Sequence, residues 1–207
     1  VVHPADSLLT ARGNIQAGQL FQAKGSSYGL QKFLADDPMW SSFEGGYFFT
    51  YYLCPTDYHR VHSPVSGKIL KATHVPGELW PVNDLSVEKV SELFAINERV
   101  VTMIAAPGGV NEGLCAAVMV GATNVGQMTM SFDSTLVTNR GQREPICRNY
   151  ESPKEIVAGA ELGVFNIGST VIVLYDRVWA QKLKDQGLLE KYESSSEGIF
   201  VKLGQGA

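Results

Sequence analysis

The chain has 207 residues, of which 44% are hydrophobic and 18% are charged, and its formal net charge is -4. This composition supplies enough apolar surface for a sizeable core and excludes an intrinsically disordered chain. The charges form no long run of one sign, so we expect no nucleic-acid partner.

Cysteine spacing and the lengths of the apolar runs narrow the class of protein further. The cysteines Cys54, Cys115 and Cys147 have no regular spacing and form no CxxC pair, so we expect neither a disulfide framework nor a zinc site. No run reaches the ~18 apolar residues that a membrane-spanning helix needs. The chain starts at Val1 without Met or a signal peptide, so we expect a processed fragment, and any membrane anchor would lie upstream.

Glycine and proline punctuate short apolar runs along the chain, which is typical of a β-rich domain. The strands should carry the β-branched and aromatic runs, and the helices should have apolar residues three and four positions apart. In chain order, the sequence predicts a short helix capped by Ser27 and ending at Leu34, a strand over 47–53, a helix over 85–94, strands over 99–104, 115–120 and 170–175, and a helix over 178–192 that Gly187 interrupts. We therefore expect a predominantly β fold (α+β) with a few peripheral helices.

A weak internal repeat indicates how the strands are organised. Residues 4–9 (PADSLL) and 17–21 (AGQLF) resemble residues 64–69 (PVSGKI) and 76–80 (PGELW). Each copy would form a turn, a strand, a tight glycine turn and a further strand. Two such copies predict a β-sandwich or barrel-like domain built from two similar β units around a pseudo-twofold axis.

Two of the four histidines, His59 and His62, lie within four residues in the segment 57–64 (DYHRVHSP). On a helix both imidazoles would share one face, whereas on an extended segment they would point to opposite faces. Pro64 favours a loop or a strand end. No third ligand follows at a metal-binding spacing, so we expect no metal site. A solvated surface loop and a proton-transfer site both remain open, because histidine titrates near neutrality.

Three further features contain side chains that could carry chemistry. Gly168-Ser169-Thr170 directly precedes the predicted strand over 170–175, and on its own this tripeptide is typical of a tight turn. Asp6 lies in an early turn, and the segment 97–100 (NERV) lies between the other features.

Together and in order, these segments resemble the phosphatidylserine decarboxylase family. The resemblance runs from about Val2 to Leu174 and is faint beyond that point. Two departures concern Ser7, where many relatives have Gly, and Ile167, where many have Leu. The segments that carry the resemblance are the turn of Asp6, 21–25 (FQAKG) with Tyr28, 57–64 (DYHRVHSP), 75–83 (VPGELWPVN), 93–100 (LFAINERV), 120–126 (VGATNVG), 161–165 (ELGVF) and 168–170 (GST).

The resemblance implies a self-cleaving decarboxylase that converts phosphatidylserine to phosphatidylethanolamine and CO2. Residues 1–207 would form a single catalytic domain, cut between Gly168 and Ser169 into a β chain (1–168) and an α chain (169–207). Asp6 would orient His59, and His59 would act as the base for Ser169. Ser169 would become a pyruvoyl cofactor whose carbonyl forms a Schiff base with the substrate amine. His62 would be a neighbour that shapes the site, and neither a metal nor pyridoxal phosphate is implied.

The implied partners are the lipid phosphatidylserine, a membrane surface and the α and β chains of one precursor. The resemblance also allows a homodimer, and it places the protein on a bacterial or mitochondrial inner membrane through an anchor outside this chain. Aromatic and apolar residues that could form a lipid-facing surface are Met39, Trp40, Phe43, Tyr47 and Phe48, but core packing is the simpler expectation for each.

Two other functions remain open. A pyruvoyl decarboxylase of the same family could act on a soluble amino acid such as tryptophan, with the same catalytic residues and a different pocket. A non-catalytic carrier or lipid-binding β domain is the second, because residues 63–69 and 75–79 resemble half of a biotinyl or lipoyl carrier domain. Lys68 and Lys71 lack the flanking Met or Asp of those carriers, which argues against that function.

Overall fold

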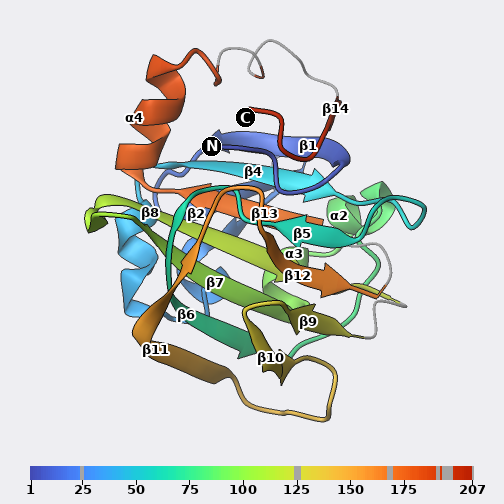
Figure 1. Cartoon of the computed structure of the whole chain (residues 1–207). Coiled ribbons are helices and arrows are strands. Elements are labelled where there is room, and N and C mark those ends of the chain that lie inside the picture. Colours follow the sequence, from blue (N-terminus) through green and yellow to red (C-terminus); the bar gives the residue numbers. More distant parts are fainter. Residues whose placement is uncertain (24–25, 124–126, 167–169, 190–191, 193–197, 207) are drawn as a thin grey trace.

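An eight-stranded antiparallel sheet forms the centre of the molecule, in the order β11-β6-β7-β8-β13-β4-β1-β14 (Figure 1). The computed structural model describes residues 1–23, 26–123, 127–166, 170–189, 192 and 198–206. The strands of this sheet are β1 (Ser7–Asn14), β4 (Tyr47–Tyr52), β6 (Gly67–Val75), β7 (Arg99–Ala106), β8 (Gly109–Val120), β11 (Ile146–Ile156), β13 (Thr170–Tyr175) and β14 (Ile199–Val201).

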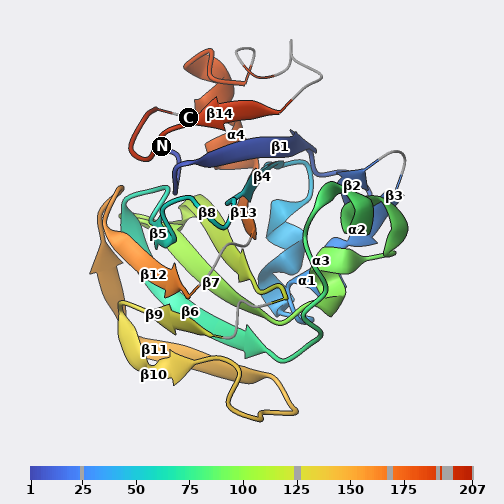
Figure 2. The same ribbon diagram turned by 90° about the vertical axis from the view of Figure 1, so that its right-hand side faces the viewer.

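A second, four-stranded sheet lies on one side of the large sheet, and the β2–β3 hairpin lies with the short helices α1, α2 and α3 on the opposite side (Figure 2). The small sheet has the order β10-β9-β12-β5. Its strands are β5 (Arg60–His62), β9 (Met128–Met130), β10 (Asp133–Val137) and β12 (Glu161–Phe165), the hairpin is β2 (Gln19–Ala23) with β3 (Ser26–Gly29), and the helices are α1 (Leu30–Phe33), η1 (Pro38–Phe43), α2 (Asp84–Lys89), α3 (Leu93–Ile96) and α4 (Arg177–Asp185). The predicted β-rich architecture with peripheral helices is confirmed, and the sheets stay open rather than closing into a barrel.

The core lies around the central strands of the large sheet. Every residue of β7 and β13 is buried, and so is the second half of β8. Strands covered on both faces need apolar residues at successive positions, which is why the sequence shows these strands as continuous apolar runs. Phe43, Tyr47 and Phe48 are also buried, while Met39 and Trp40 pack partly buried against the core, so core packing explains all five.

The predicted internal repeat is present in the structure, and it is larger than the sequence indicates. β1 and β6 each lie second from an edge of the large sheet. Each pairs with an edge strand in an equivalent register. Ser7, the first residue of β1, lies opposite Val201, and Gly67, the first residue of β6, lies opposite Ile156. Each also has a register shift just after its third residue, where it pairs with β4 or β7. The two β units are therefore related by an approximate twofold axis between β8 and β13.

Hydrogen bonds repeat the same relation. In each copy, two backbone hydrogen bonds join the turn before the strand to a neighbouring segment close to the edge strand. In the first copy, the His3 amide donates to the Gln205 carbonyl and the Gly204 amide donates to the His3 carbonyl. In the second copy, the Ser63 amide donates to the Ala160 carbonyl and the Gly159 amide donates to the Ser63 carbonyl. The two copies also form a reciprocal pair of hydrogen bonds with each other, as the two halves of a twofold-symmetric interface do. The Val2 amide donates to the Pro64 carbonyl (2.9 Å), and the His62 amide donates to the Pro4 carbonyl (2.7 Å).

Several predicted elements differ from the observed ones. The further strand of the second copy is absent from the described structure, since Glu78 forms only an isolated bridge. Ser27 does not cap α1: it lies in β3, whose pairing with β2 overrides the local helix signal, and the helix follows Gly29. The predicted helix over 85–94 is two helices, because the backbone turns at Glu92, which has a φ of 54°.

The C-terminal helix forms as predicted but ends early. α4 stops at Asp185, before Gly187, whose φ of 67° suits glycine and ends the helix. Across the described part of the chain, no helix combines the length and the apolar character that a bilayer crossing requires.

Candidate active site

One end of the large sheet brings together the segments that carry the predicted catalytic residues. Tyr52, the last residue of β4, pairs with Leu8 of β1 on one side and with Thr170 of β13 on the other. Asp6 precedes Leu8 by two residues, and Ser169 precedes Thr170 by one. Strand register therefore places the Asp6 turn and the start of β13 on either side of the end of β4.

Residues 167–169 lie outside the described residues, and they include Ile167 and both sides of the predicted cleavage site, Gly168 and Ser169. The described residues on either side of this stretch are Asn166 and Thr170. The Asn166 amide donates to the Gln127 carbonyl (3.2 Å), and Thr170 is fully inside the sheet with 1% of its surface exposed.

His59 lies in the loop that leaves the end of β4 and leads to β5. Its carbonyl accepts a hydrogen bond from the amide of Phe165, the last residue of β12 (3.0 Å). Its Nε2 lies 3.0 Å from the Pro55 carbonyl. A carbonyl only accepts, so Nε2 carries the hydrogen and a neutral ring keeps its lone pair on Nδ1. Nδ1 is buried and has no hydrogen-bond partner among the described residues.

Asp6 lies in the turn before β1, and its side chain is half-buried. Oδ1 accepts a hydrogen bond from the Leu203 amide (2.7 Å). No hydrogen bond joins Asp6 to His59 within the described residues, so the structure brings their segments together without forming the predicted contact. Ser7, the departure next to Asp6, fits without disturbing the turn, because its hydroxyl donates to the Ala5 carbonyl (3.2 Å).

His62 has a partner for each ring nitrogen. Nδ1 lies 2.8 Å from the Gly159 carbonyl and Nε2 lies 3.2 Å from the Tyr58 hydroxyl, and the two rings stack at 5.8 Å. Glu161 of β12 pairs with His62 in the small sheet. A hydrogen bond from Ser131, and a second one from Arg60, lower the pKa of the Glu161 carboxyl group. These contacts hold His62 in the junction between the two β units, and its predicted role as a neighbour that shapes the site stays a prediction.

The first two residues of the segment 97–100 also have structural contacts. Asn97 is fully buried, and its side chain binds the backbone of Trp80 and the carbonyl of Gly121. Glu98 pairs with buried His74 through Nε2 (2.7 Å) and accepts from the Asn139 amide (2.9 Å).

Arg99, the third residue of this segment, makes four contacts with backbone carbonyls. Its guanidinium donates to the carbonyls of Phe33, Ala95, Asn97 and Lys32 at 2.8–3.0 Å. Burial lowers the pKa of Arg99 to about 10, against an opposing effect of Tyr28, so the side chain stays charged at neutral pH. The segment therefore fixes α1, α3 and the start of β7 in place.

A cavity of about 470 Å³ opens beside Thr170. Its lining includes Gln22, Thr50, Tyr52, Asp84, Phe94 and Thr170. The sequence includes Gln22 in a family-like segment but gives no sign that Thr50 would face the same space, since Thr50 is one residue within an apolar strand. Burial raises the pKa of Tyr52, with smaller contributions from Cys54, Asp84 and Asp57.

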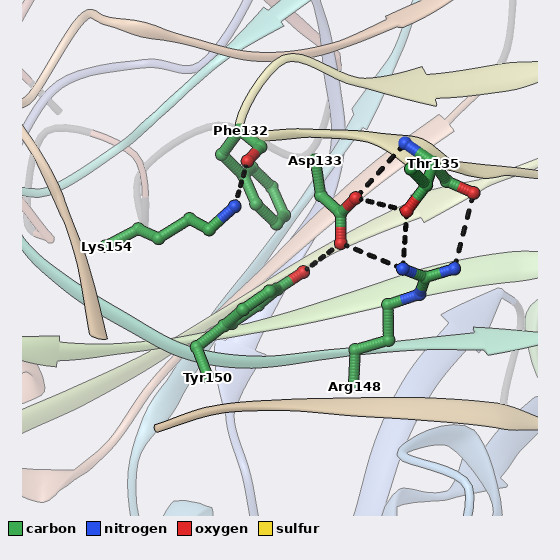
Figure 3. A network of polar contacts seen from close by, with 6 residues as sticks. All are labelled: Phe132, Asp133, Thr135, Arg148, Tyr150 and Lys154. Carbon is green, nitrogen blue, oxygen red and sulfur yellow. Dashed lines mark hydrogen bonds and ion pairs between the residues drawn. The ribbon is translucent and has the colours of Figure 1, made fainter. Parts of the chain in front are cut away.

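A separate polar network joins β10 to β11 and contains none of the predicted catalytic residues (Figure 3). Asp133 accepts from the Thr135 hydroxyl (2.7 Å) and the Tyr150 hydroxyl (2.9 Å), and it faces Arg148. Lys154 donates to the Phe132 carbonyl. This network fastens the small sheet to the edge of the large one. Over the described residues, no three His, Cys, Asp or Glu side chains are grouped so that they could hold a metal ion.

Comparison with known proteins identifies a family for this chain. The family model described as phosphatidylserine decarboxylase matches residues 1–204. Three similar proteins, each named phosphatidylserine decarboxylase proenzyme, come from Anaeromyxobacter sp. (strain K), with 44% identity over 177 residues, Myxococcus xanthus (strain DK1622), with 39% over 192, and Shewanella pealeana, with 39% over 212.

These alignments cover 85%, 91% and 98% of this chain and 61%, 66% and 70% of the respective relatives. The chain thus spans about two thirds of the length of the curated relatives that it matches. Since the family match covers nearly the whole chain, and the segments that carry it converge at one end of the sheet, the chain belongs to the phosphatidylserine decarboxylase family.

Proposed function

We propose that this protein decarboxylates phosphatidylserine to phosphatidylethanolamine and that it makes its own pyruvoyl cofactor from Ser169. Family membership supports the reaction class. The observation that carries the proposal is the pairing of Tyr52 with both Leu8 and Thr170, because it sets the Asp6 turn and the chain next to Ser169 around the strand that leads to His59.

Cofactor formation begins with the Ser169 hydroxyl. Its Oγ attacks the Gly168 carbonyl carbon and the C–N bond breaks, so the peptide becomes an ester. Loss of the proton on Cα of residue 169 then expels the Gly168 carboxylate and leaves a dehydroalanine. One water molecule hydrolyses its imine form, releasing ammonia and leaving the pyruvoyl group at the start of the α chain. Gly168 suits this step, because it has no Cβ to obstruct the attack.

His59 is our candidate base for the first step. Its Nδ1 is buried and lacks a partner among the described residues, so its lone pair is free to take a proton. Asp6 can orient the ring if the Nε2–H moves from the Pro55 carbonyl to the second carboxylate oxygen. A charge-assisted hydrogen bond is stronger than one to a neutral carbonyl, which favours this exchange.

The cavity beside Thr170 suits a cofactor made from the preceding residue. Thr170 is part of the cavity wall, and the cofactor would be bonded directly to it. A pyruvoyl carbonyl condensed with the substrate amine accepts the electron pair that remains when CO2 leaves. The chain's own contribution is to hold the headgroup, exclude water and return a proton to the product, and His59 is our candidate for that proton.

Cleavage should leave the two chains associated. The α chain (169–207) contains β13, which lies between β8 and β4, and β14, which pairs with β1. Six residue pairs join β13 to each neighbour, so the strand stays hydrogen-bonded on both sides without a covalent link. The further partner in this proposal is the surface of a bacterial or mitochondrial inner membrane, where the lipid substrate resides, and a homodimer remains a prediction.

The proposal is tested by intact mass under denaturing conditions together with CO2 release. We expect two fragments split after Gly168, with the second lighter by one ammonia than a chain that begins with serine. Vesicles of phosphatidylserine should release CO2, whereas free tryptophan or serine should not. A single unmodified chain without activity would contradict the proposal, and CO2 from the free amino acid alone would favour the soluble-substrate alternative.

Two variants test the assigned roles. Ser169→Ala should remain one chain and be inactive, and an intact but active variant would refute the cofactor assignment. His59→Ala should slow self-cleavage at least tenfold, since a general base contributes about 10²- to 10⁴-fold. Normal processing of His59→Ala would remove His59 from the role of base.

Asp6 has a test that separates chemistry from folding. In the second β unit, Ser66 occupies the equivalent position, and its Oγ accepts from the Ala158 amide (3.0 Å) as Asp6 accepts from Leu203. Asp6→Ser should therefore keep the turn and the thermal stability while it slows self-cleavage. Unchanged processing would show that the carboxylate serves only the turn.

A further inference from the structure

Two residues that line the cavity beside Thr170 each have a polar atom without a hydrogen-bond partner in the described part of the chain. Oε1 of Gln22 and Oγ1 of Thr50 are buried and have no hydrogen-bond partner among the described residues. Both residues line the cavity, and their exposed fractions are 4% and 2%. A buried polar atom without a partner is unfavourable, so a ligand that supplies the partner would be bound more tightly.

The orientation of the Gln22 amide is fixed by its other end. Nε2 donates to the carbonyls of Val87 and Val90, each at 2.8 Å, at the end of α2. Carbonyls only accept, so the two bonds identify this atom as the nitrogen and the unpaired atom as the oxygen. The Gln22 oxygen is thus fixed as an acceptor, and no described residue donates to it.

The charges around the cavity favour the same kind of ligand. Asp84 and Glu88 on α2 line it, and none of its described lining residues is Lys, Arg or His. Asp84 also helps to raise the pKa of Tyr52 across the cavity, after the larger effect of burial. A cavity wall with acceptors and the Asp84 carboxylate attracts a cationic donor and repels a phosphate group.

We propose that this cavity holds the amine end of the substrate headgroup, with Thr50 and the Gln22 oxygen as its hydrogen-bonding partners and the phosphodiester left outside. The inference rests on the proposed function, since it places the amine beside the residue that follows the cofactor. Thr50 and Gln22 are then specificity-determining residues for a primary amine, and they should disfavour a headgroup that carries a hydroxyl in its place.

Thr50→Val is the cleanest variant. It keeps the shape and removes only a hydroxyl that makes no hydrogen bond in the described structure. Thr102→Val is the matched control: Thr102 is also fully buried in a strand of the same sheet, its hydroxyl also lacks a partner among the described residues, and it does not line the cavity. Gln22→Leu is the second variant, with circular dichroism and thermal unfolding as checks, because it also removes the bonds to α2.

The first readout is binding without turnover, by saturation-transfer NMR with ethanolamine and with ethylene glycol, its neutral analogue. Wild type and Thr102→Val should bind ethanolamine and bind ethylene glycol at least tenfold more weakly. Thr50→Val should bind ethanolamine about tenfold more weakly than wild type, the loss expected for one hydrogen bond to a charged group. Equal binding of the two probes, or no loss in Thr50→Val and Gln22→Leu, would overturn the inference.

The second readout separates the inference from the proposed function. Intact mass should show complete processing of Thr50→Val, and soluble dihexanoyl phosphatidylserine should show a KM raised about tenfold with kcat little changed, as expected for lost binding of the headgroup. If wild type is neither cleaved nor active, the proposed function fails while ethanolamine binding still tests the subsite. If wild type is active and Thr50→Val keeps its KM and its ethanolamine affinity, the subsite alone is wrong.

Discussion

Replacing Arg99 with Met should destabilise the fold without acting on the chemistry directly. The guanidinium is 2% exposed and donates to the carbonyls of four residues from α1, α3 and the turn before β7. Met has a similar length and fills the space, but it cannot donate. The variant therefore leaves four carbonyl oxygens without that donor.

The magnitude follows from two opposing terms. The apolar Met side chain, buried in the same space, contributes about 3 kcal/mol of its own. Four hydrogen bonds from a charged donor contribute at least about 1.5 kcal/mol each, or about 6 kcal/mol together. Arg99→Met should therefore lower the free energy of unfolding by about 3 kcal/mol.

The assay is equilibrium unfolding in urea, followed by tryptophan fluorescence. A Ser169→Ala background should keep the protein as one chain, so that unfolding does not include dissociation of the two fragments. Arg140→Met is the control, because Arg140 is exposed and its change should stay within about 0.5 kcal/mol. A loss below about 1 kcal/mol for Arg99→Met would refute the structural role. Lost self-cleavage with unchanged stability, measured without the background variant, would assign Arg99 to the chemistry instead.

Two other predictions test local features of the β units. A Cβ on Gly67 would lie 2.0 Å from the Ala105 carbonyl oxygen, so Gly67→Ala should lower the free energy of unfolding by about 2 kcal/mol or more, measured in urea. Hydrogen bonds from Ser131 and Arg60 hold the pKa of Glu161 below its ordinary 4.5. Its contribution is therefore present above pH 4.5 and lost as the pH falls, so the stability advantage of wild type over Glu161→Gln should disappear in acid. An advantage that is the same at all pH values would contradict this.

The sequence predicts the strands of the core better than the helices around it. β4, β7, β13 and the second half of β8 are apolar runs because both of their faces are covered, and that signal is local. The helix signal at Ser27 fails because β3 forms by pairing with β2, a contact that no short window of sequence contains. The break at Glu92 is equally hidden, since an αL conformation of Glu has no residue signature.

For the candidate site, too, the sequence predicts some features and misses those that depend on contacts between distant segments. The resemblance places Asp6 and His59 in segments that the strand register does bring to one end of the sheet. It does not reveal that Nε2 of His59 binds the Pro55 carbonyl, or that Thr50 faces a cavity beside Thr170. Those facts depend on how the segments meet in three dimensions, and a single sequence holds no pairing information for them.

The approximate twofold axis offers an internal comparison that separates folding from chemistry. The turns before β1 and β6 make the same backbone hydrogen bonds, yet one has a carboxylate where the other has the hydroxyl of Ser66. Since a serine suffices for the turn, the turn alone does not explain the carboxylate of Asp6. The two units also differ at the ends of their inner strands: β8 follows β7 through a tight hairpin, whereas β13 follows β12 of the other sheet. In the second arrangement the chain reaches β13 from β12, whose last residue, Phe165, donates its amide to the His59 carbonyl, so the proposed chemistry falls where the two copies diverge.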